Sequence, residues 1–294
     1  MIKVIASDLD GTLLNEHHTL NRTTCEAIKK AQKKGLRFMI ATGRAFKQVE
    51  QITDENDITC DYLVSSGGEV RTPDKEIVLS GCMKMEDCKA VYEILSKYTV
   101  PYVFNTAEYD YCIGTKESME HNILNHIFAF NQSATLDEIR KSPMYKAMVA
   151  KTKVVASFAE LEELQPRIIK IFIFTNDLEM LAQIEERLIK NDNLAVASSF
   201  SNNLEITDKS AQKGPVLKSY IESLGYTMDE VMVFGDSMND YSMLSMDFGA
   251  TIAMENADEK VKAVAKYITK SNIEDGVAYA IEELLARREV EGAF

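Results

Sequence analysis

The sequence predicts an α/β protein whose doubly wound, mainly parallel sheet carries an inserted α+β domain. In the first and last thirds of the chain, apolar runs alternate with amphipathic helices, which favours parallel strands joined by right-handed crossovers. In the middle third, short strands follow one another directly, which favours antiparallel pairing. The length of 294 residues suits about two domains. We therefore expect one α/β domain formed by residues 1–83 and 209–294, and an inserted α+β domain formed by residues 84–208.

The individual elements follow from apolar periodicity and flanking turn residues. Asn21 or Thr23 suits the N-cap of the first helix, and Gly35 suits its end. The expected elements of the first segment are strand 2–7, helix 21–35, strand 36–43, helix 44–56, strand 61–68 and a hairpin over 69–80 that turns at 72–75. Those of the middle are helix 85–98, strands 101–107 and 109–114, helix 117–130, a mixed segment to 165, strand 167–174, helix 177–191, and strands 194–200 and 203–207. Those of the last segment are helix 213–225, strand 231–235, helix 240–246, strand 248–254, helix 257–265, strand 267–269 and helix 273–289.

Composition and charge narrow the class of protein. The chain is 46% hydrophobic and 27% charged, which suits a globular protein with a sizeable core. Its net charge of −13 disfavours nucleic-acid binding, which depends on Lys and Arg neutralising phosphates. A small phosphorylated substrate is compatible with this charge, because the local field matters more there.

Cysteine usage and hydropathy indicate a cytoplasmic protein. The five cysteines are odd in number and contain no C-x-x-C pair, so they are expected to be reduced thiols. The apolar run at the start of the sequence is too short for a signal peptide, because aspartates follow it almost at once. No apolar run approaches the ~18 residues that a membrane span needs.

The first apolar run ends in two aspartates, Asp8 and Asp10, which Gly-Thr follows. In extended backbone their side chains point to the same side, roughly 6.5–7 Å apart, at a strand end where open α/β sheets bind ligands. Like charges at ~4 Å repel by about 4 kcal/mol at an effective dielectric near 20, so we expect a cation between them. Mg²⁺ suits this place because it prefers carboxylates together with water and phosphate. The same residues also suit a solvated turn or a helix cap, and this motif alone leaves both interpretations open.

Two further positions carry phosphate-binding chemistry. Thr42 ends the second strand at the same edge of the predicted sheet, and its hydroxyl together with Gly43 suits a phosphoryl oxygen. Lys213 begins a helix, where cations are mildly disfavoured, so it indicates a compensating anion such as phosphate. Alone, Thr42 equally fits a turn that introduces a helix, and Lys213 fits a solvent-facing side chain.

A last polar cluster directly follows the apolar strand 231–235. It consists of Asp236, Ser237, Asn239 and Asp240. Asp236 could complete an oxygen ligand set with the first two aspartates, whereas Asn239 or Asp240 could simply cap the next helix. Because four separate strand ends or helix starts carry an acid, a hydroxyl, a cation and an acid on one edge of a sheet, we interpret them jointly as one site.

These motifs resemble those of the haloacid dehalogenase-like (HAD) hydrolases, and within them the Cof-type phosphatases with a subclass IIB cap. "DLDGTLL" is similar to the first motif of the family, "ATGR" to the second, Lys213 to the third and "GDSMND" to the fourth. The resemblance covers essentially the whole chain and implies a Rossmann-like core with an inserted cap that confers substrate specificity. The chain departs from the family at "SSGGE", where an Asn-Gly-Ala-like turn is usual, which leaves open how this loop meets the substrate.

The resemblance also implies roles for single residues in metal-dependent phosphoryl transfer. Asp8 would be the nucleophile that forms an aspartyl-phosphate, and Asp10 the general acid and base. Mg²⁺ would be held by the Asp8 carboxylate, the Asp10 carbonyl and Asp236, with help from Ser237 through water. The phosphoryl oxygens would be held by the Leu9 N–H, Thr42, Gly43, Lys213 and Asn239. Asp240 would orient Lys213 or a metal-bound water.

We therefore predict a Mg²⁺-dependent phosphatase that hydrolyses a small phosphorylated metabolite, with a sugar phosphate as the first expectation. The alternatives are a phosphomutase of the same superfamily and a non-catalytic phospho-acceptor or regulatory binder. We expect a small phosphate ester as partner and neither nucleic acid nor membrane; the oligomeric state stays open and is compatible with a monomer. Aromatic and Asn side chains within 101–112 are candidate substrate contacts, whereas His17 and His18, in the loop after the first motif, are expected to face solvent.

Overall fold

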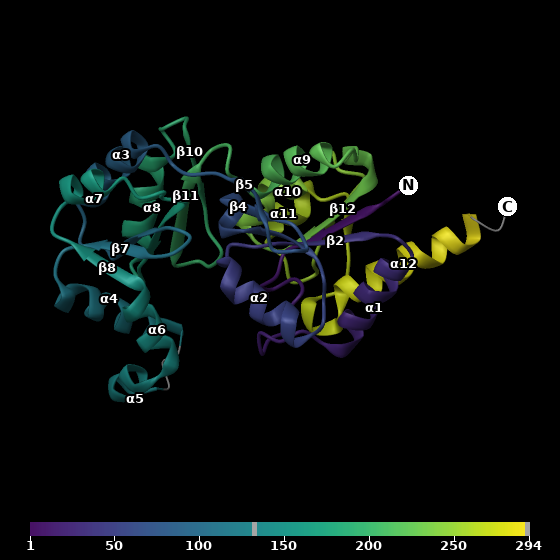
Figure 1. Cartoon of the computed structure of the whole chain (residues 1–294), viewed down its shortest axis with the longest axis horizontal. Coiled ribbons are helices and arrows are strands. Elements are labelled where there is room, and N and C mark those ends of the chain that lie inside the picture. The colour runs from purple at the N-terminus through teal and green to yellow at the C-terminus, as the bar shows by residue number, and fades with distance from the viewer. Residues whose placement is uncertain (131–133, 292–294) are drawn as a thin grey trace. The chain divides into compact units, whose positions relative to one another are not determined.

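The computed structural model describes residues 1–130 and 134–291, and the chain divides into two compact units (Figure 1). The core unit contains Met1–Gly81 and Ser210–Phe294, and the inserted unit contains Cys82–Lys209. The sequence predicts these boundaries at 83/84 and 208/209. The core unit is thus built from both ends of the chain, whereas the inserted unit comes from one continuous segment.

The core unit is organised around one sheet, with the strand order β14-β13-β12-β1-β2-β3-β4-β5 among the described residues. The strands from β14 to β3 pair in parallel, and β4 and β5 add an antiparallel hairpin at one edge. The doubly wound, mainly parallel fold predicted from the sequence is confirmed. The strands are β1 Val4–Ser7, β2 Arg37–Ala41, β3 Asp61–Val64, β4 Glu69–Arg71, β5 Ile77–Ser80, β12 Val231–Gly235, β13 Ala250–Ala253 and β14 Tyr267–Ile268.

The order of these strands defines where a ligand site belongs. β1 has β2 on one side and β12 on the other, so the strands that follow β1 and those that follow β12 proceed in opposite directions. This reversal is the topological switch point at which open α/β sheets bind ligands, beyond the carboxyl ends of the strands.

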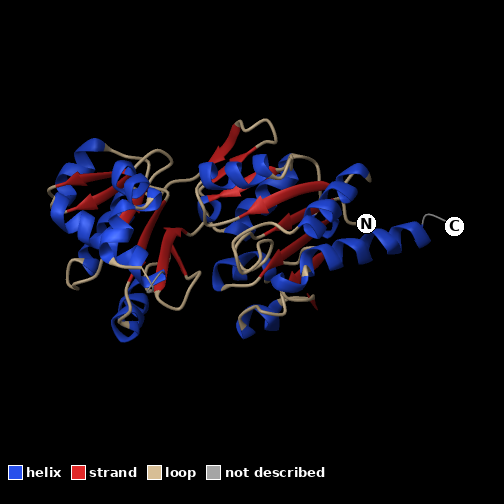
Figure 2. Cartoon of the chain, turned by 90° about the horizontal axis from the view of Figure 1, so that it is seen from below, coloured by secondary structure: helices blue, strands red, loops and turns tan. Residues whose placement is uncertain are grey.

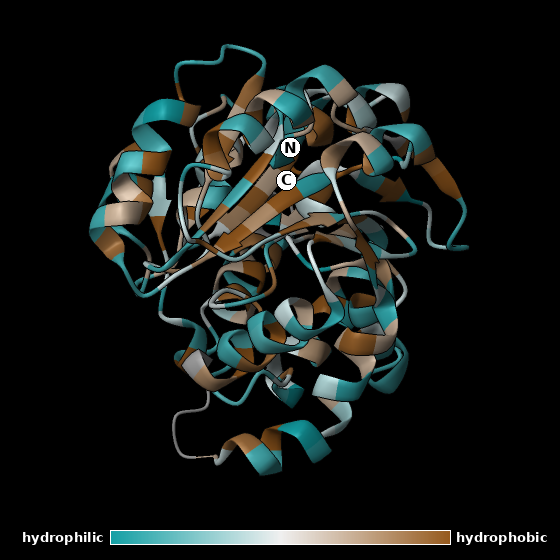
Figure 3. Ribbon diagram, turned by 90° about the vertical axis from the view of Figure 1, so that its left-hand side faces the viewer, coloured by the Kyte–Doolittle hydropathy of each residue, from teal (hydrophilic) through white to brown (hydrophobic). Residues whose placement is uncertain are grey.

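Helices cover both faces of the core sheet. Figure 1 shows α9 and α10 on one side and α1, α2 and α12 on the other. β1 is buried along its whole length, as expected for a central parallel strand covered on both faces. Figure 3 shows the strands mostly in apolar colours and the helices mixing apolar and polar residues, which fits amphipathic helices. The helices are α1 Arg22–Lys33, α2 Phe46–Glu55, α9 Lys213–Ser223, α10 Tyr241–Leu244, α11 Glu259–Val264 and α12 Gly276–Glu291.

The inserted unit has a second sheet, and Figure 2 shows the strands of the chain in red. In the described part of the chain its strand order is β10-β11-β9-β6-β7-β8. Its neighbours pair antiparallel, as the adjacent short strands predict, except that β7 and β8 are parallel. A parallel pair requires a crossover, and helices between β7 and β8 provide one. The sequence predicts the first of these helices over 117–130, whereas the others lie in the segment that it left as mixed. The strands are β6 Tyr102–Asn105, β7 Asp110–Ile113, β8 Thr152–Val155, β9 Lys170–Phe174, β10 Leu194–Ala197 and β11 Asn203–Asp208.

Two hydrophobic clusters lie on opposite faces of this second sheet. Tyr111 and Val155 belong to one cluster, with α3, α7 and α8. Their sequence neighbours Cys112 and Val154 belong to the other cluster, with α4, α5 and α6, because successive side chains of a strand alternate between faces. The helices are α3 Met85–Leu95, α4 Lys116–Phe130, α5 Leu136–Lys141, α6 Pro143–Lys151, α7 Phe158–Leu164 and α8 Leu178–Leu188.

Candidate active site

Asp8 lies directly after β1, beside the switch point of the core sheet. Its N–H donates to the carbonyl of Phe234 on β12 at 3.0 Å, so the register of the two strands fixes its backbone. The residue is 3% exposed. Burial raises the pKa of Asp8 well above its ordinary value, the charge of Asp240 adds to this, and Lys213 counteracts it. The next residue, Leu9, is fully buried, and its carbonyl accepts the N–H groups of the following turn.

Lys213, the first residue of α9, is the cation that Asp8 contacts. Its Nζ lies 2.5 Å from Asp8 Oδ1, 2.6 Å from Asp240 Oδ1 and 3.4 Å from Asn239 Oδ1. The ammonium is buried, which alone would lower its pKa, but the charges of Asp240 and Asp8 raise the pKa above its usual value. Lys213 is therefore charged at neutral pH and bridges the ends of β1 and β12.

The loop after β12 is organised by Asp240. Its Oδ2 accepts the N–H of Asp236 at 3.0 Å and that of Ser237 at 3.2 Å, while its Oδ1 binds Lys213. Ser237 Oγ in turn donates to Asn239 Oδ1 at 2.9 Å. Asp240 is fully buried, so these donors take the place of water as the hydrogen-bond partners of its carboxylate. The structure thus places Asp240 as a support of Lys213 and of the loop.

Asp236 faces Asp8 from the end of β12. Its Oδ1 accepts from the hydroxyl of Thr12 at 2.8 Å. Burial raises the pKa of Asp236 to about 7, with a further contribution from the Asp240 charge. An acid with so high a pKa is held in a place where a positive charge would be favourable.

Asp8, Asp236 and Asp240 each offer a carboxylate oxygen within 4.8 Å of the others. Asp240 already uses both oxygens for Lys213 and two backbone N–H groups, which leaves Asp8 and Asp236 as the side chains suited to hold an ion. Asp8 is buried and Asp236 partly buried, both have raised pKa values, and their oxygen donors fit a hard divalent cation. The residues present therefore fit a divalent metal ion.

Asp10 is not drawn into this cluster of carboxylates. Its carboxylate is paired with Arg44, and the Nδ1 of His18 lies 3.4 Å from its Oδ1. Each of the two carboxylates thus has a basic partner of its own, Lys213 for Asp8 and Arg44 for Asp10. His18, expected in solvent, keeps a largely exposed side chain but approaches Asp10.

Thr42 lies at the end of β2, where the sequence predicts it, and is 1% exposed. Its carbonyl accepts the N–H of Ser66 at 3.0 Å, and its hydroxyl accepts the N–H of Arg44 at 3.2 Å; Gly43 lies between them in the chain. Ser65 and Ser66 have positive φ values of 54° and 61°. The unusual "SSGG" turn thus ties the end of β3 to the loop that carries Thr42.

Three residues that support the site were not assigned from the sequence: Gly11, Thr12 and Arg44. Gly11 and Thr12 belong to the D-x-D-G-T stretch, so their place in that motif was the available signal. Arg44 follows "ATG" directly, but nothing in the sequence indicates which acid it contacts.

Gly11 supplies a prediction about the metal site. It has a φ of +76°, and a Cβ at this position would lie 2.4 Å from Asp236 Oδ2. Gly11→Ala is therefore expected to displace the Asp236 carboxylate and to weaken divalent-cation binding by roughly 10–100-fold, the range known for residues that support metal ligands. Calorimetric titration with Mg²⁺ measures this.

Gly35→Ala is the matched control for Gly11→Ala. Gly35 has a φ of +84°, and a Cβ there would meet nothing within 4 Å. Both variants impose the same left-handed backbone on alanine, but only one places a methyl group against Asp236. Equal cation affinity of the two variants would contradict the assignment of Asp236 as a ligand.

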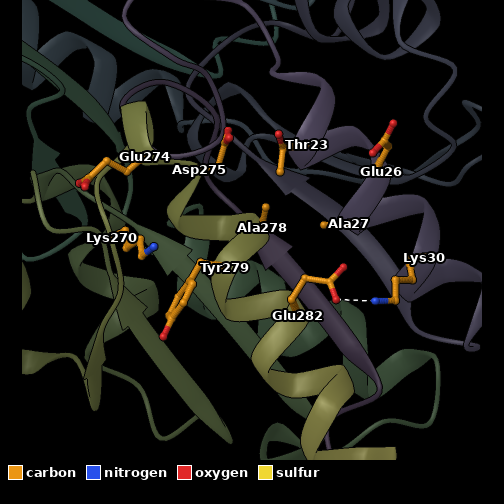
Figure 4. A pocket seen from close by; sticks show the side chains of 10 residues that line it. All are labelled: Thr23, Glu26, Ala27, Lys30, Lys270, Glu274, Asp275, Ala278, Tyr279 and Glu282. Carbon is orange, nitrogen blue, oxygen red and sulfur yellow. Dashed lines mark hydrogen bonds and ion pairs between the residues drawn. The ribbon is translucent and has the colours of Figure 1, made fainter.

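A hollow of about 470 Å³ lies elsewhere in the core unit, between α1 and α12 (Figure 4). Its lining includes none of the predicted site residues, and two of its acids already have partners. Asp275 accepts from Asn21 and Thr24, and Glu282 pairs with Lys30. We therefore place the chemistry at the ends of β1 and β12 rather than in this hollow.

Among the described residues, no helix combines the length and apolarity needed to cross a membrane.

Curated relatives and solved structures resemble the chain over nearly its whole length. The phosphatase YwtE of Bacillus subtilis, named for 5-amino-6-(5-phospho-D-ribitylamino)uracil, is 30% identical over 97% of this chain and 99% of its own length. Phosphatase YwpJ of the same organism is 29% identical over 97% of this chain and 100% of its own length.

Among solved structures, a haloacid dehalogenase-like hydrolase from B. subtilis superposes with a TM-score of 0.80 at 27% identity, covering 96% of this chain and 100% of that one. The HAD subclass IIB sugar phosphatase BT4131 has the same fold, with a TM-score of 0.74 at 24% identity, over 96% of this chain and 98% of that one. The family described as haloacid dehalogenase-like hydrolase matches residues 5–281. The resemblance inferred from the motifs is confirmed, and the chain belongs to the haloacid dehalogenase-like hydrolases as a phosphatase-type enzyme.

Proposed function

We propose that the chain is a Mg²⁺-dependent phosphatase that releases phosphate from a small phosphorylated metabolite through an aspartyl-phosphate on Asp8. The observation that carries this proposal is the cluster at the switch point of buried Asp8 and Lys213 with the partly buried Asp236. Phosphoryl transfer needs positioned groups and neutralised charge more than elaborate covalent chemistry, and this arrangement offers both.

The first half of the proposed reaction centres on Asp8. A carboxylate oxygen of Asp8 attacks phosphorus, the Asp8–phosphorus bond forms, and the bond from phosphorus to the ester oxygen breaks. Asp10 gives a proton to the departing oxygen. Lys213 keeps a positive charge beside the nucleophile, and the Leu9 N–H, Thr42, Gly43 and Asn239 hold the phosphoryl oxygens. A bound Mg²⁺ would neutralise charge on the phosphoryl group while Asp8, the Asp10 carbonyl and Asp236, with Ser237, hold it.

In the second half, water attacks the aspartyl-phosphate. Asp10 takes a proton from this water, the bond between Asp8 and phosphorus breaks, and inorganic phosphate leaves. The ionised carboxylate of Asp10 is the form needed for this step. A mutase would return the phosphoryl group to a substrate instead, so release of inorganic phosphate separates the two outcomes.

The inserted unit is proposed to act as a cap that selects the substrate. The subclass IIB fold likeness supports this, together with the polar and aromatic residues of β6 and β7. Two relatives are named for 5-amino-6-(5-phospho-D-ribitylamino)uracil, so a phosphorylated polyol carrying a heterocycle stands beside the sugar phosphates as a candidate substrate. The five free cysteines support the proposed cytoplasmic location.

The test is phosphate release from a panel of metabolite phosphates, with Mg²⁺ and with EDTA. The panel contains sugar phosphates, flavin mononucleotide, pyridoxal phosphate and 5-amino-6-(5-phospho-D-ribitylamino)uracil. Turnover that requires Mg²⁺ is expected for at least one ester. Phosphate binding without turnover of any ester would favour the regulatory binder instead.

A further inference from the structure

The carboxylate of Asp10 is bound by Arg44, a side chain to which the resemblance assigned no role. Arg44 Nε lies 2.7 Å from Asp10 Oδ2, and Arg44 Nη2 lies 2.5 Å from Asp10 Oδ1. This two-pronged contact fixes both the place and the plane of the carboxylate, because the guanidinium is itself planar and rigid.

The backbone of Arg44 is also fixed. Its N–H donates to the hydroxyl of Thr42, and its carbonyl accepts the N–H of Ser65 at 2.8 Å. Ser65 adopts the left-handed backbone conformation that this contact requires. The loops after β2 and β3 therefore hold Arg44 at a defined position in contact with Asp10.

A second basic side chain, His18, also approaches the Asp10 carboxylate. His18 Nδ1 lies 3.4 Å from Oδ1, the oxygen that Arg44 Nη2 also contacts. His18 has a φ of 56°, in a loop whose Thr19 N–H and hydroxyl both donate to Asn15 Oδ1. Oδ1 is thus approached by two groups, whereas Arg44 Nε approaches Oδ2.

We propose that Arg44 is a positioning residue for Asp10, which it orients so that Oδ2 faces the ester oxygen of the substrate. The proposal rests on the proposed function. A carboxylate has about two lone pairs on each oxygen, so with Arg44 on both oxygens and His18 on Oδ1, Oδ2 keeps a lone pair for proton transfer. Misplacement of a reacting group by about 1 Å can cost about 100-fold in rate.

A purely structural role is the competing explanation, and it fits the contact less well. The side chains of Arg44 and Asp10 are 26% and 33% exposed, and ion pairs near the surface contribute little to stability. Such a pair would not need the two contacts, to the Thr42 hydroxyl and the Ser65 N–H, that fix the backbone of Arg44.

The test is Arg44→Gln assayed on two esters of similar size, benzyl phosphate and p-nitrophenyl phosphate. Benzyl alkoxide needs a proton as it leaves, whereas p-nitrophenolate leaves without one. We expect kcat/KM to fall about 100-fold for benzyl phosphate and less than about fivefold for p-nitrophenyl phosphate. Arg44→Lys keeps the charge but loses the two-pronged contact, and is expected to behave like Arg44→Gln.

A double-mutant cycle isolates the route through Asp10. Adding Arg44→Gln to Asp10→Asn should change kcat/KM by no more than about twofold, because the group to be positioned is already gone. Arg22→Gln, which removes an exposed arginine paired with Glu26 on α1, serves as the control and should match the wild type.

Three results would overturn the proposal. These are equal losses on the two esters, a rise in KM without a change in kcat, and an undiminished further loss in the Asp10→Asn background. The second would make Arg44 a direct substrate contact. Failure of the proposed function would show differently, as absence of turnover by the wild type on every ester.

Discussion

Asp8→Asn is expected to abolish phosphate release, with kcat reduced by about 10⁴-fold or more, the scale seen when a nucleophile is removed. An amide keeps the size of the side chain and can still accept the hydrogen bond from Lys213, but it cannot form the aspartyl-phosphate. The measurement is release of inorganic phosphate from the best substrate of the panel at saturating Mg²⁺.

The same variant is expected to fold at least as stably as the wild type in EDTA at pH 7. The pKa of the Asp8 carboxyl is raised above its ordinary value, chiefly by burial, so its ionised form opposes folding at neutral pH. Removal of that charge therefore stabilises the metal-free protein, which urea unfolding measures. Asp247→Asn, at an exposed acid of the core unit, is the control and should keep full activity. Turnover of Asp8→Asn within tenfold of the wild type would refute the nucleophile assignment.

Lys213→Met is expected to combine the second large loss of activity with a large loss of stability. The change removes the buried cation that contacts Asp8 and Asp240, so both buried carboxylates lose the positive charge that neutralises them. Removal of one partner of a buried ion pair costs about 3–5 kcal/mol of unfolding free energy. We expect kcat to fall by about 10³-fold, since the loss of one charge-stabilising group in an active site costs about 10²–10³.

The sign of the pH dependence distinguishes this mechanism from a simple packing defect. In Lys213→Met the pKa of Asp8 stays above its unfolded value of 3.8, so the folded state binds more protons and stability falls as the pH rises from that value. The destabilisation should therefore be larger at pH 8 than at pH 5 in urea unfolding with EDTA. Lys218→Met, on the same helix with a half-exposed side chain, should show no such difference. A pH-independent loss in Lys213→Met would indicate packing alone.

The sequence was sufficient to predict the fold class because the strands of the core are short apolar runs with turn residues after them. It also predicted that Asp8, Thr42, Lys213 and Asp236 follow strand ends or begin a helix, and parallel topology then places such positions at one edge. What it could not provide is which charged groups contact each other. Lys213 could have bound Asp8, Asp240 or neither, because the contact depends on how α9 packs against the loop after β12.

The basic partner of Asp10 was missed for the same reason. Arg44 reaches Asp10 only because the loops after β2 and β3 fold onto each other. That contact depends on left-handed backbone at Ser65 and Ser66, and serine is not a residue type that predicts such a conformation. In the inserted unit, the parallel pairing of β7 with β8 was missed because β8 and the later helices of the crossover lie in a segment without clear periodicity.

The split of the core unit has a consequence for the order in which the protein is made. Asp8 is synthesised early. In contrast, Lys213 and β12, the strand that pairs with β1, belong to the last third of the chain. The continuous segment Cys82–Lys209 is complete before either of them exists and can acquire its own hydrophobic clusters meanwhile, since domains fold as units during synthesis. A nascent chain that stops at Lys209 therefore carries Asp8, the proposed nucleophile, without Lys213 or Asp236, so the candidate site is assembled only after the inserted unit has been made.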